Sequence, residues 1–259
     1  MKQLRLFLFF ALSVIIFSCS KDEDPTPANS SLETATLSLS SNTTVVAAPA
    51  AMKASTNEYA QMATGYVEGV NAMTSYLSYF TPPAGAVKSS TSITASNARV
   101  ASTQKEYLVY IWTDANNGSV AYQVSEESDK YVFELFFKAK SGSNWLRYLY
   151  AEEKKDRSSG LMKVYDVFTG GPSTTVLFSY NWARTGDQLD VTMEIPDEDP
   201  QFVFKTVISI NVKTKAGSVS YYIGNVKEYN MTWDAAGNGT WTWYEEDGKT
   251  VNESGTWKV

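Results

Sequence analysis

The chain has 259 residues, of which 43% are hydrophobic and 14% aromatic, and it carries a formal charge of −6. This composition excludes a disordered chain and is typical of one sizeable folded domain, and the negative charge argues against nucleic acid as a partner. Histidine is absent, which excludes Ser-His-Asp and Cys-His catalysis and imidazole metal sites. The sole cysteine, Cys19, excludes disulfides within one chain. We therefore expect neither an enzyme nor a bound cofactor.

The first eighteen residues have the pattern of an export signal. Lys2 and Arg5 make a short positive start, residues 6–17 form an apolar run, and the small residue Ser18 precedes Cys19. An apolar run of this length is well short of the roughly 20 residues that a membrane-spanning helix requires. The pattern predicts a cleaved signal peptide over residues 1–18.

The tetrapeptide Ile16-Phe17-Ser18-Cys19 resembles the lipobox of bacterial lipoproteins, in which the cysteine is acylated and becomes the mature amino terminus. The next five residues, Ser20-Lys21-Asp22-Glu23-Asp24, are similar to the acidic surface-export signal of lipoproteins from the Bacteroidota. This resemblance implies lipidation at Cys19 and a position on the outer membrane, exposed at the cell surface. The membrane would then be a partner through the lipid anchor alone, because no basic amphipathic helix is expected.

Residues 19–55 are predicted to be a flexible tether. They consist largely of Ser, Thr, Ala, Asn and Pro and contain no aromatic residue, so we expect little buried surface there. A short strand built on Leu37, Leu39, Val45 and Val46 is the alternative for part of this segment.

Residues 56–104 are predicted to be a helix and a linker. Apolar residues recur at spacings of three and four over 57–80, as an amphipathic helix requires, at Tyr59, Met62, Tyr66, Val70, Met73, Leu77 and Phe80. Ser55-Thr-Asn-Glu58 matches a capping box, and Pro82-Pro83 should stop the helix. We interpret the apolar stripe as packing on a sheet and not as a cofactor site, and residues 84–103 as a linker.

From residue 105 to 259 the period becomes two, which predicts a β domain. Turn residues such as Gly186-Asp187 and Asp247-Gly248 separate the candidate strands at hairpin spacing, so the strands should form an antiparallel meander. The predicted strands are 106–112, 119–125, 130–138, 145–151, 161–168, 174–183, 188–195, 201–212, 218–223, 226–233, 239–244 and 254–259.

The apolar pattern of these strands predicts how the sheet is covered. In Leu189-Asp-Val-Thr-Met-Glu-Ile195 every second residue should face a core. Residues 107–112 and 131–137 are apolar on both faces, which suggests a core on one side and the 57–80 helix on the other. We therefore predict a mainly β fold, an antiparallel meander curled into an open or closed barrel, with one N-terminal amphipathic helix packed on or in it. This architecture is similar to LolA/LolB-type or lipocalin-like lipoproteins, although no residue motif is shared.

The leading functional hypothesis is non-enzymatic binding of a lipid or other hydrophobic ligand inside the curled sheet. The candidate ligand-binding residues are aromatic or large apolar residues of the predicted interior: Phe178, Trp182, Met193, Phe204, Trp233, Trp241 and Trp243. Trp233, Trp241, Trp243 and Trp257 could instead form a stacking platform for sugar rings, which would make the protein a surface glycan-binding module. A structural or adhesion lipoprotein is the third possibility, and protein partners are not predicted.

Acidic residues offer the remaining chemistry. Asp190 and Glu194 share one strand face, but that face is polar, so we do not expect them to act as a catalytic pair. Residues 196–200 cluster three acids without the ligand spacing of a calcium loop and are predicted to be a solvated turn. Residues 152–157 alternate in charge and are predicted to be a solvated turn as well. No metal site is expected.

Overall fold

A computed structural model describes residues 30–35, 46–76, 81–93, 106–114, 118–167, 175–197, 199 and 202–259. The predicted signal peptide, the lipidation residue Cys19 and the candidate strand residues Leu37, Leu39 and Val45 lie outside these described residues. Among the helices that the structure describes, none combines the length and apolar character that crossing a bilayer demands.

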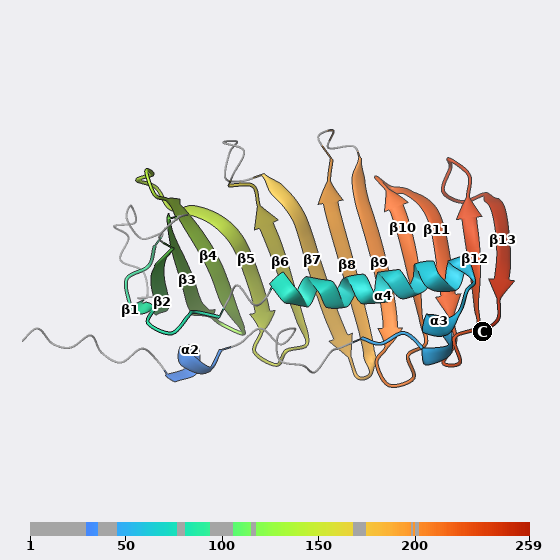
Figure 1. Cartoon of the computed structure of the whole chain (residues 1–259), viewed down its shortest axis with the longest axis horizontal. Coiled ribbons are helices and arrows are strands. Elements are labelled where there is room, and N and C mark those ends of the chain that lie inside the picture. Colours follow the sequence, from blue (N-terminus) through green and yellow to red (C-terminus); the bar gives the residue numbers. More distant parts are fainter. Residues whose placement is uncertain are drawn as a thin grey trace, which may run out of the picture.

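The described chain is mainly β and forms one antiparallel sheet whose thirteen strands follow chain order (Figure 1). The strands are β1 Val87–Ser89, β2 Tyr107–Asp114, β3 Gly118–Glu127, β4 Lys130–Ala139, β5 Leu146–Lys154, β6 Ser159–Tyr165, β7 Val176–Thr185, β8 Gln188–Pro196, β9 Val203–Asn211, β10 Gly217–Ile223, β11 Val226–Trp233, β12 Gly239–Tyr244 and β13 Val251–Trp257. The sheet is not closed, because β1 pairs with β2 and β13 pairs with β12 at its two ends. The predicted meander is confirmed in its open form, and β1 is an additional strand within the predicted linker.

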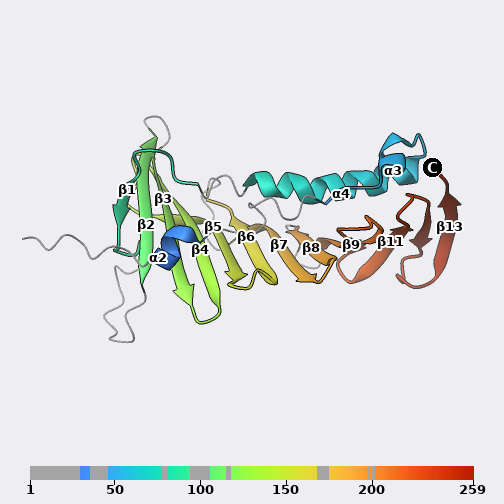
Figure 2. The same ribbon diagram turned by 90° about the horizontal axis from the view of Figure 1, so that it is seen from below.

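Helix α4, Glu58–Tyr76, crosses one face of the sheet from β6 to β12 (Figures 1 and 2). We call this the inner face and the opposite one the outer face. Most fully buried apolar side chains point inward from successive strands and join α4 in one core that extends from Leu108 on β2 to Trp257 on β13. Asn57 caps the start of the helix, because its side-chain Oδ1 accepts hydrogen bonds from the backbone N–H groups of Tyr59 and Ala60 at 3.0 and 3.2 Å. The cap is therefore Asn57 and not the predicted Ser55.

Part of the predicted tether is ordered, which corrects that expectation. Helix α3, Ala50–Ala54, buries Met52 completely, and the extended residues before it bury Val46 and Ala48. The Asn71 side chain of α4 holds the backbone of Val46 at both its N–H and its C=O, at 3.1 and 2.7 Å. Helix α2, Ser30–Thr34, lies on β2 and β3 and buries Leu32. A few apolar residues are enough to order a Ser/Thr-rich segment when a large sheet is already present.

Strands β2 to β4 are buried on both faces. This was predicted for β2 and β4 but not for β3, and the helix does not provide the second cover. Their inward residues join the main core near α2, whereas Val109, Ala121, Val132 and Phe136 are buried on the outer face. Helix α4 lies farther along the sheet, on the inner side (Figure 2). The two-sided pattern therefore marks a second, smaller outer core.

Strand β8 follows the predicted alternation only over its first half. Leu189 and Val191 are buried, Met193 is half-buried, and Ile195 is 54% exposed. The expectation that all four face a core is wrong at Ile195. The side chains on the inner face therefore become more exposed toward the end of β8.

Candidate functional site

Tryptophan side chains on the inner face cover glycines of the neighbouring strand. Four cross-strand partners have this arrangement: Trp182 with Gly160, Trp233 with Gly217, Trp241 with Gly255, and Trp257 with Gly239. A Cβ atom added at any of these glycines would overlap the indole ring. An aromatic side chain that shields a bare strand backbone stabilises a sheet, so these pairs account for much of the tryptophan-rich carboxy-terminal region.

All seven predicted ligand-binding residues face inward, but they come from five strands and do not line one open pocket. Trp182, Trp233 and Trp241 are buried, whereas Phe178, Met193, Phe204 and Trp243 are half-buried. Tyr59 of α4 stacks on Trp241 with ring centroids 4.2 Å apart. The alternative of a sugar-stacking platform on Trp233, Trp241, Trp243 and Trp257 is not supported, because Trp233, Trp241 and Trp257 are buried in the core. Trp243 is half-buried and packs against Tyr229.

Two polar atoms on the inner face lack partners. Tyr180 is fully buried and Trp182 is 4% exposed, and their rings lie 6.0 Å apart on β7. Neither the hydroxyl of Tyr180 nor the indole N–H of Trp182 forms a hydrogen bond in the described part of the chain. Burial also raises the pKa of Tyr180, so its hydroxyl remains a neutral donor. Buried polar groups are normally hydrogen-bonded, and the pair therefore offers two donors in an apolar setting.

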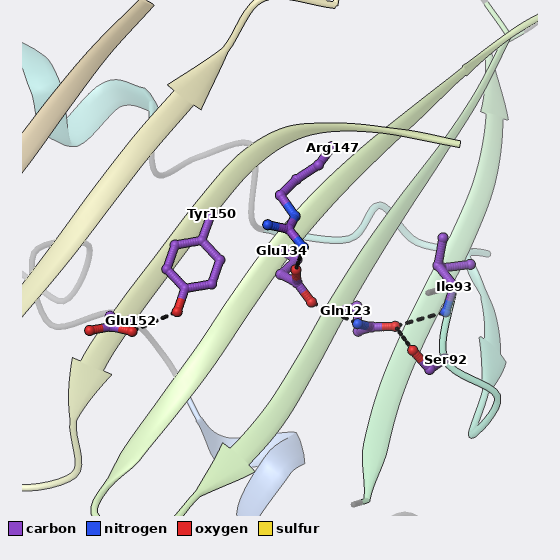
Figure 3. Close-up of polar contacts among 7 residues, drawn as sticks. All are labelled: Ser92, Ile93, Gln123, Glu134, Arg147, Tyr150 and Glu152. Carbon is purple, nitrogen blue, oxygen red and sulfur yellow. Dashed lines mark hydrogen bonds and ion pairs between the residues drawn. The ribbon is translucent and has the colours of Figure 1, made fainter. Parts of the chain in front are cut away.

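A chain of polar contacts crosses the outer face of β3 to β5 (Figure 3). Gln123 accepts hydrogen bonds from Ser92 Oγ and the Ile93 N–H at 3.0 and 2.9 Å, and its own amide donates to Glu134 at 2.8 Å. Glu134 pairs in turn with Arg147 at 3.0 Å. Gln123 and Glu134 are both buried, so this chain ties the segment after β1 to the sheet.

A second polar group lies beside it on β5 (Figure 3). Glu152 Oε2 accepts hydrogen bonds from Lys130 Nζ at 2.7 Å and from the Tyr150 hydroxyl at 2.6 Å. Burial alone would raise the pKa of Glu152, but the hydrogen bonds from Lys130 and Tyr150 lower it overall. The bond to Glu152 raises the pKa of Lys130, and burial together with that carboxylate raises the pKa of Tyr150. At neutral pH the site therefore holds a carboxylate, an ammonium group and a protonated phenol.

This group borders a cavity of about 400 Å³ over β4 to β7. Its lining consists of Asp129, Lys130, Glu152, Glu153, Lys154, Ser159, Gly160, Leu161 and Asn181. Strand alternation and register place Lys130, Glu152, Leu161 and Asn181 on the outer face. The prediction of a solvated turn over residues 152–157 is therefore wrong at its start, since Glu152 and Glu153 lie in β5 and Glu153 is buried.

The other acidic candidates form no comparable site. Asp190 is exposed and accepts a hydrogen bond from Ser209, and Glu194 lies across from Lys205. Within the residues that the structure describes, no cluster of acidic side chains could hold a metal ion.

Sequence reasoning missed the polar residues of both faces. A signal for Glu134 was present, because it interrupts residues 131–137, which are otherwise apolar on both faces. Gln123 gave no such signal, because it alternates with the apolar residues of its strand as a solvent-facing residue would. Tyr180 could have been found from its alternation with Phe178 and Trp182. The cavity could not have been found from the sequence, because its lining depends on the register of four strands.

No protein-family model matches this chain, and no curated protein matches it either.

Proposed function

We propose that the protein is a lipid-anchored, non-enzymatic binding protein of the outer membrane that holds a hydrophobic ligand between the inner face and α4. The observation that carries this proposal is the pair of unpartnered buried donors, Tyr180 OH and Trp182 Nε1. Leaving such groups unpaired costs free energy of about 1–3 kcal/mol each. A ligand that accepts hydrogen bonds from them would remove that cost.

The chemistry of the pair defines the ligand class. An indole N–H can only donate, so the ligand must present an acceptor oxygen. A charged carboxylate would be costly in this apolar setting without a cation beside it. We therefore infer a neutral acyl carbonyl, as in an acyl ester or amide, with its hydrocarbon chain against the apolar inner face.

Helix α4 is suited to act as a displaceable cover. Gly65 and Gly69 lie within it, and apart from the helix's own backbone nearby no atom lies within 4 Å of where their Cβ atoms would be, so packing does not require glycine at either position. A glycine inside a helix destabilises it by roughly 0.5–1 kcal/mol relative to alanine. Weak intrinsic helicity supports a cover that can be displaced without unfolding the sheet.

The substitution Tyr180→Phe tests the ligand site. In ligand-free protein it should raise the free energy of unfolding, by an amount on the order of 1 kcal/mol, because it removes an unpaired buried hydroxyl. It should also weaken saturable binding of a fluorescent fatty acyl ester by up to about tenfold. Urea unfolding measures the expected gain in stability, and titration of the same preparation with the ester measures the expected loss of affinity.

Tyr229→Phe is the matched control, since the Tyr229 hydroxyl is hydrogen-bonded to that of Tyr66. It should lower stability but should not weaken ester binding, because the lost bond joins the covering helix to the sheet and does not contact the ligand. A wild-type protein that does not bind the ester, or a Tyr180→Phe variant that binds it as well as wild type does, would refute the ligand proposal.

The anchor is tested separately. Two acyl chains give stable membrane attachment, whereas one gives only marginal binding. Cys19→Ala should therefore release the protein from the membrane fraction. A variant that remains fully membrane-bound would contradict lipid anchoring at Cys19.

A further inference from the structure

The outer face contains a cavity, and a ligand there would not need the space beneath α4. The cavity over β4 to β7 has a volume of about 400 Å³, within the range of about 300–1,000 Å³ that is usual for small-molecule sites. Its side chains converge from four consecutive strands, with Lys130 on β4, Glu152 on β5, Leu161 on β6 and Asn181 on β7. A site built on strands holds its groups more precisely than one built on loops.

The Lys130 ammonium group and the Glu152 carboxylate are held in place without a ligand. Lys130 and Tyr150 both donate to Oε2 of Glu152, which orients the carboxylate. Its other oxygen, Oε1, has no hydrogen-bond partner within the described residues and remains an acceptor. The amide of Asn181 and the hydroxyl of Ser159 add groups that both donate and accept.

The charge balance selects among ligand classes. Strand alternation turns the Glu153 side chain to the inner face, so the charged side chains left to the cavity are Asp129 and Glu152 with Lys130 and Lys154, and their formal charges cancel. A balanced charge favours neither a phosphate or sulfate nor a metal cation. Mixed donors and acceptors beside the apolar Leu161 instead match a ligand with many hydroxyl groups and an apolar C–H surface.

We propose that this outer-face cavity binds a neutral saccharide unit. The sugar hydroxyls donate to Glu152 Oε1 and accept from the Asn181 amide and the Lys130 ammonium group, and its C–H groups contact Leu161. The acceptor that the carboxylate provides is already oriented, so binding orders few additional side chains.

The test uses the purified full-length protein on a panel of immobilised neutral oligosaccharides, with sulfated and phosphorylated oligosaccharides alongside. At least one neutral oligosaccharide should bind. Asn181→Leu should weaken that binding by at least about tenfold, because it removes the amide and leaves the Lys130–Glu152 pair in place. Ser159→Ala is a second, milder variant that should weaken binding less and preserve the fold.

Thr192→Val is the matched control, since Thr192 lies across from Asn181 on the same face but does not line the cavity. It should leave the affinity within about twofold of wild type. Tyr180→Phe should leave saccharide binding unchanged, which separates this site from the one beneath α4. The inference is overturned if no neutral oligosaccharide binds, if only charged ones bind, or if folded Asn181→Leu and Ser159→Ala both bind as wild type does.

Discussion

The two ends of the sheet are stabilised in different ways, although both belong to one meander. Strands β2 to β4 are buried on both faces, and their outer face includes the polar chain through Gln123 and Glu134. Strands β10 to β13 are packed on their inner face, whereas their outer face carries half-buried or exposed residues such as Ser218, Thr232 and Thr240. Strand pairing alone therefore does not determine how a region is stabilised. One end depends on buried hydrogen bonds and the other on large aromatic side chains over glycine.

The largest effect should come from the aromatic end. Trp257→Ala removes a buried indole, its hydrogen bond to the Gly237 carbonyl at 2.8 Å and the cover of Gly239. We expect a loss of about 3–5 kcal/mol in the free energy of unfolding, measured by urea denaturation. Trp145→Ala, at a half-buried ring beside Lys138, should cost much less. Equal losses would contradict the structural role of the tryptophan–glycine pairs.

The polar end should respond to loss of a single hydrogen-bonding side chain. Gln123→Leu leaves Glu134 Oε2, Ser92 Oγ and the Ile93 N–H without the partner they have now. We expect the free energy of unfolding to fall by about 1–3 kcal/mol, and thermal or urea unfolding measures this loss. Thr232→Val, on the exposed outer face of β11, should stay within about 0.5 kcal/mol of wild type. If both variants behaved alike, the outer faces of the two regions would not differ in energetic importance.

Replacing glycine by alanine should have opposite effects on stability in the helix and in the sheet. Gly65→Ala and Gly69→Ala should each stabilise the protein by roughly 0.5–1 kcal/mol, because both positions are helical and open. Gly160→Ala should destabilise it, since the new Cβ would overlap Trp182. Melting temperatures of the three variants give the comparison, and a destabilising Gly65→Ala would show that α4 needs glycine there.

The smallest effect concerns pH. Glu152 has a lowered pKa in the folded protein, so its contribution to stability is present above the ordinary glutamate pKa of about 4.3 and is lost as the pH falls through the folded value. Glu152→Gln should therefore be less stable than wild type at neutral pH, and the difference should shrink on acidification. Melting curves at several pH values measure it. A difference that is independent of pH would exclude the carboxylate charge as its source.

Much of the fold was predictable because local rules determine it. Period-two alternation located twelve of the strands, and glycines such as Gly186 and Gly248 adopt positive φ in the turns between them. The helices α2 and α3 were missed because each buries only one or two large residues within a Ser/Thr-rich segment. The position of α4 could not be predicted either, since an amphipathic stripe does not specify which strands it will cover.

The sites were harder to predict than the fold for a related reason. Alternation shows that Phe178, Tyr180 and Trp182 share a face, but not that α4 covers that face or that two donors there have no partner. The outer cavity depends on four aligned strands, and a shift of one residue in any of them would turn its side chains to the other face.

The order of the strands has a consequence for how the molecule folds. Every strand neighbour in the sheet is also a neighbour in sequence, so the hairpins can form one after another with short loop closures, and such local contacts favour fast folding. Helix α4 is different, because its contact between Tyr59 and Trp241 joins positions far apart in the chain. Although α4 is synthesised before the sheet, it can dock fully only after β11 and β12 exist, and we expect its docking to be the last step of folding.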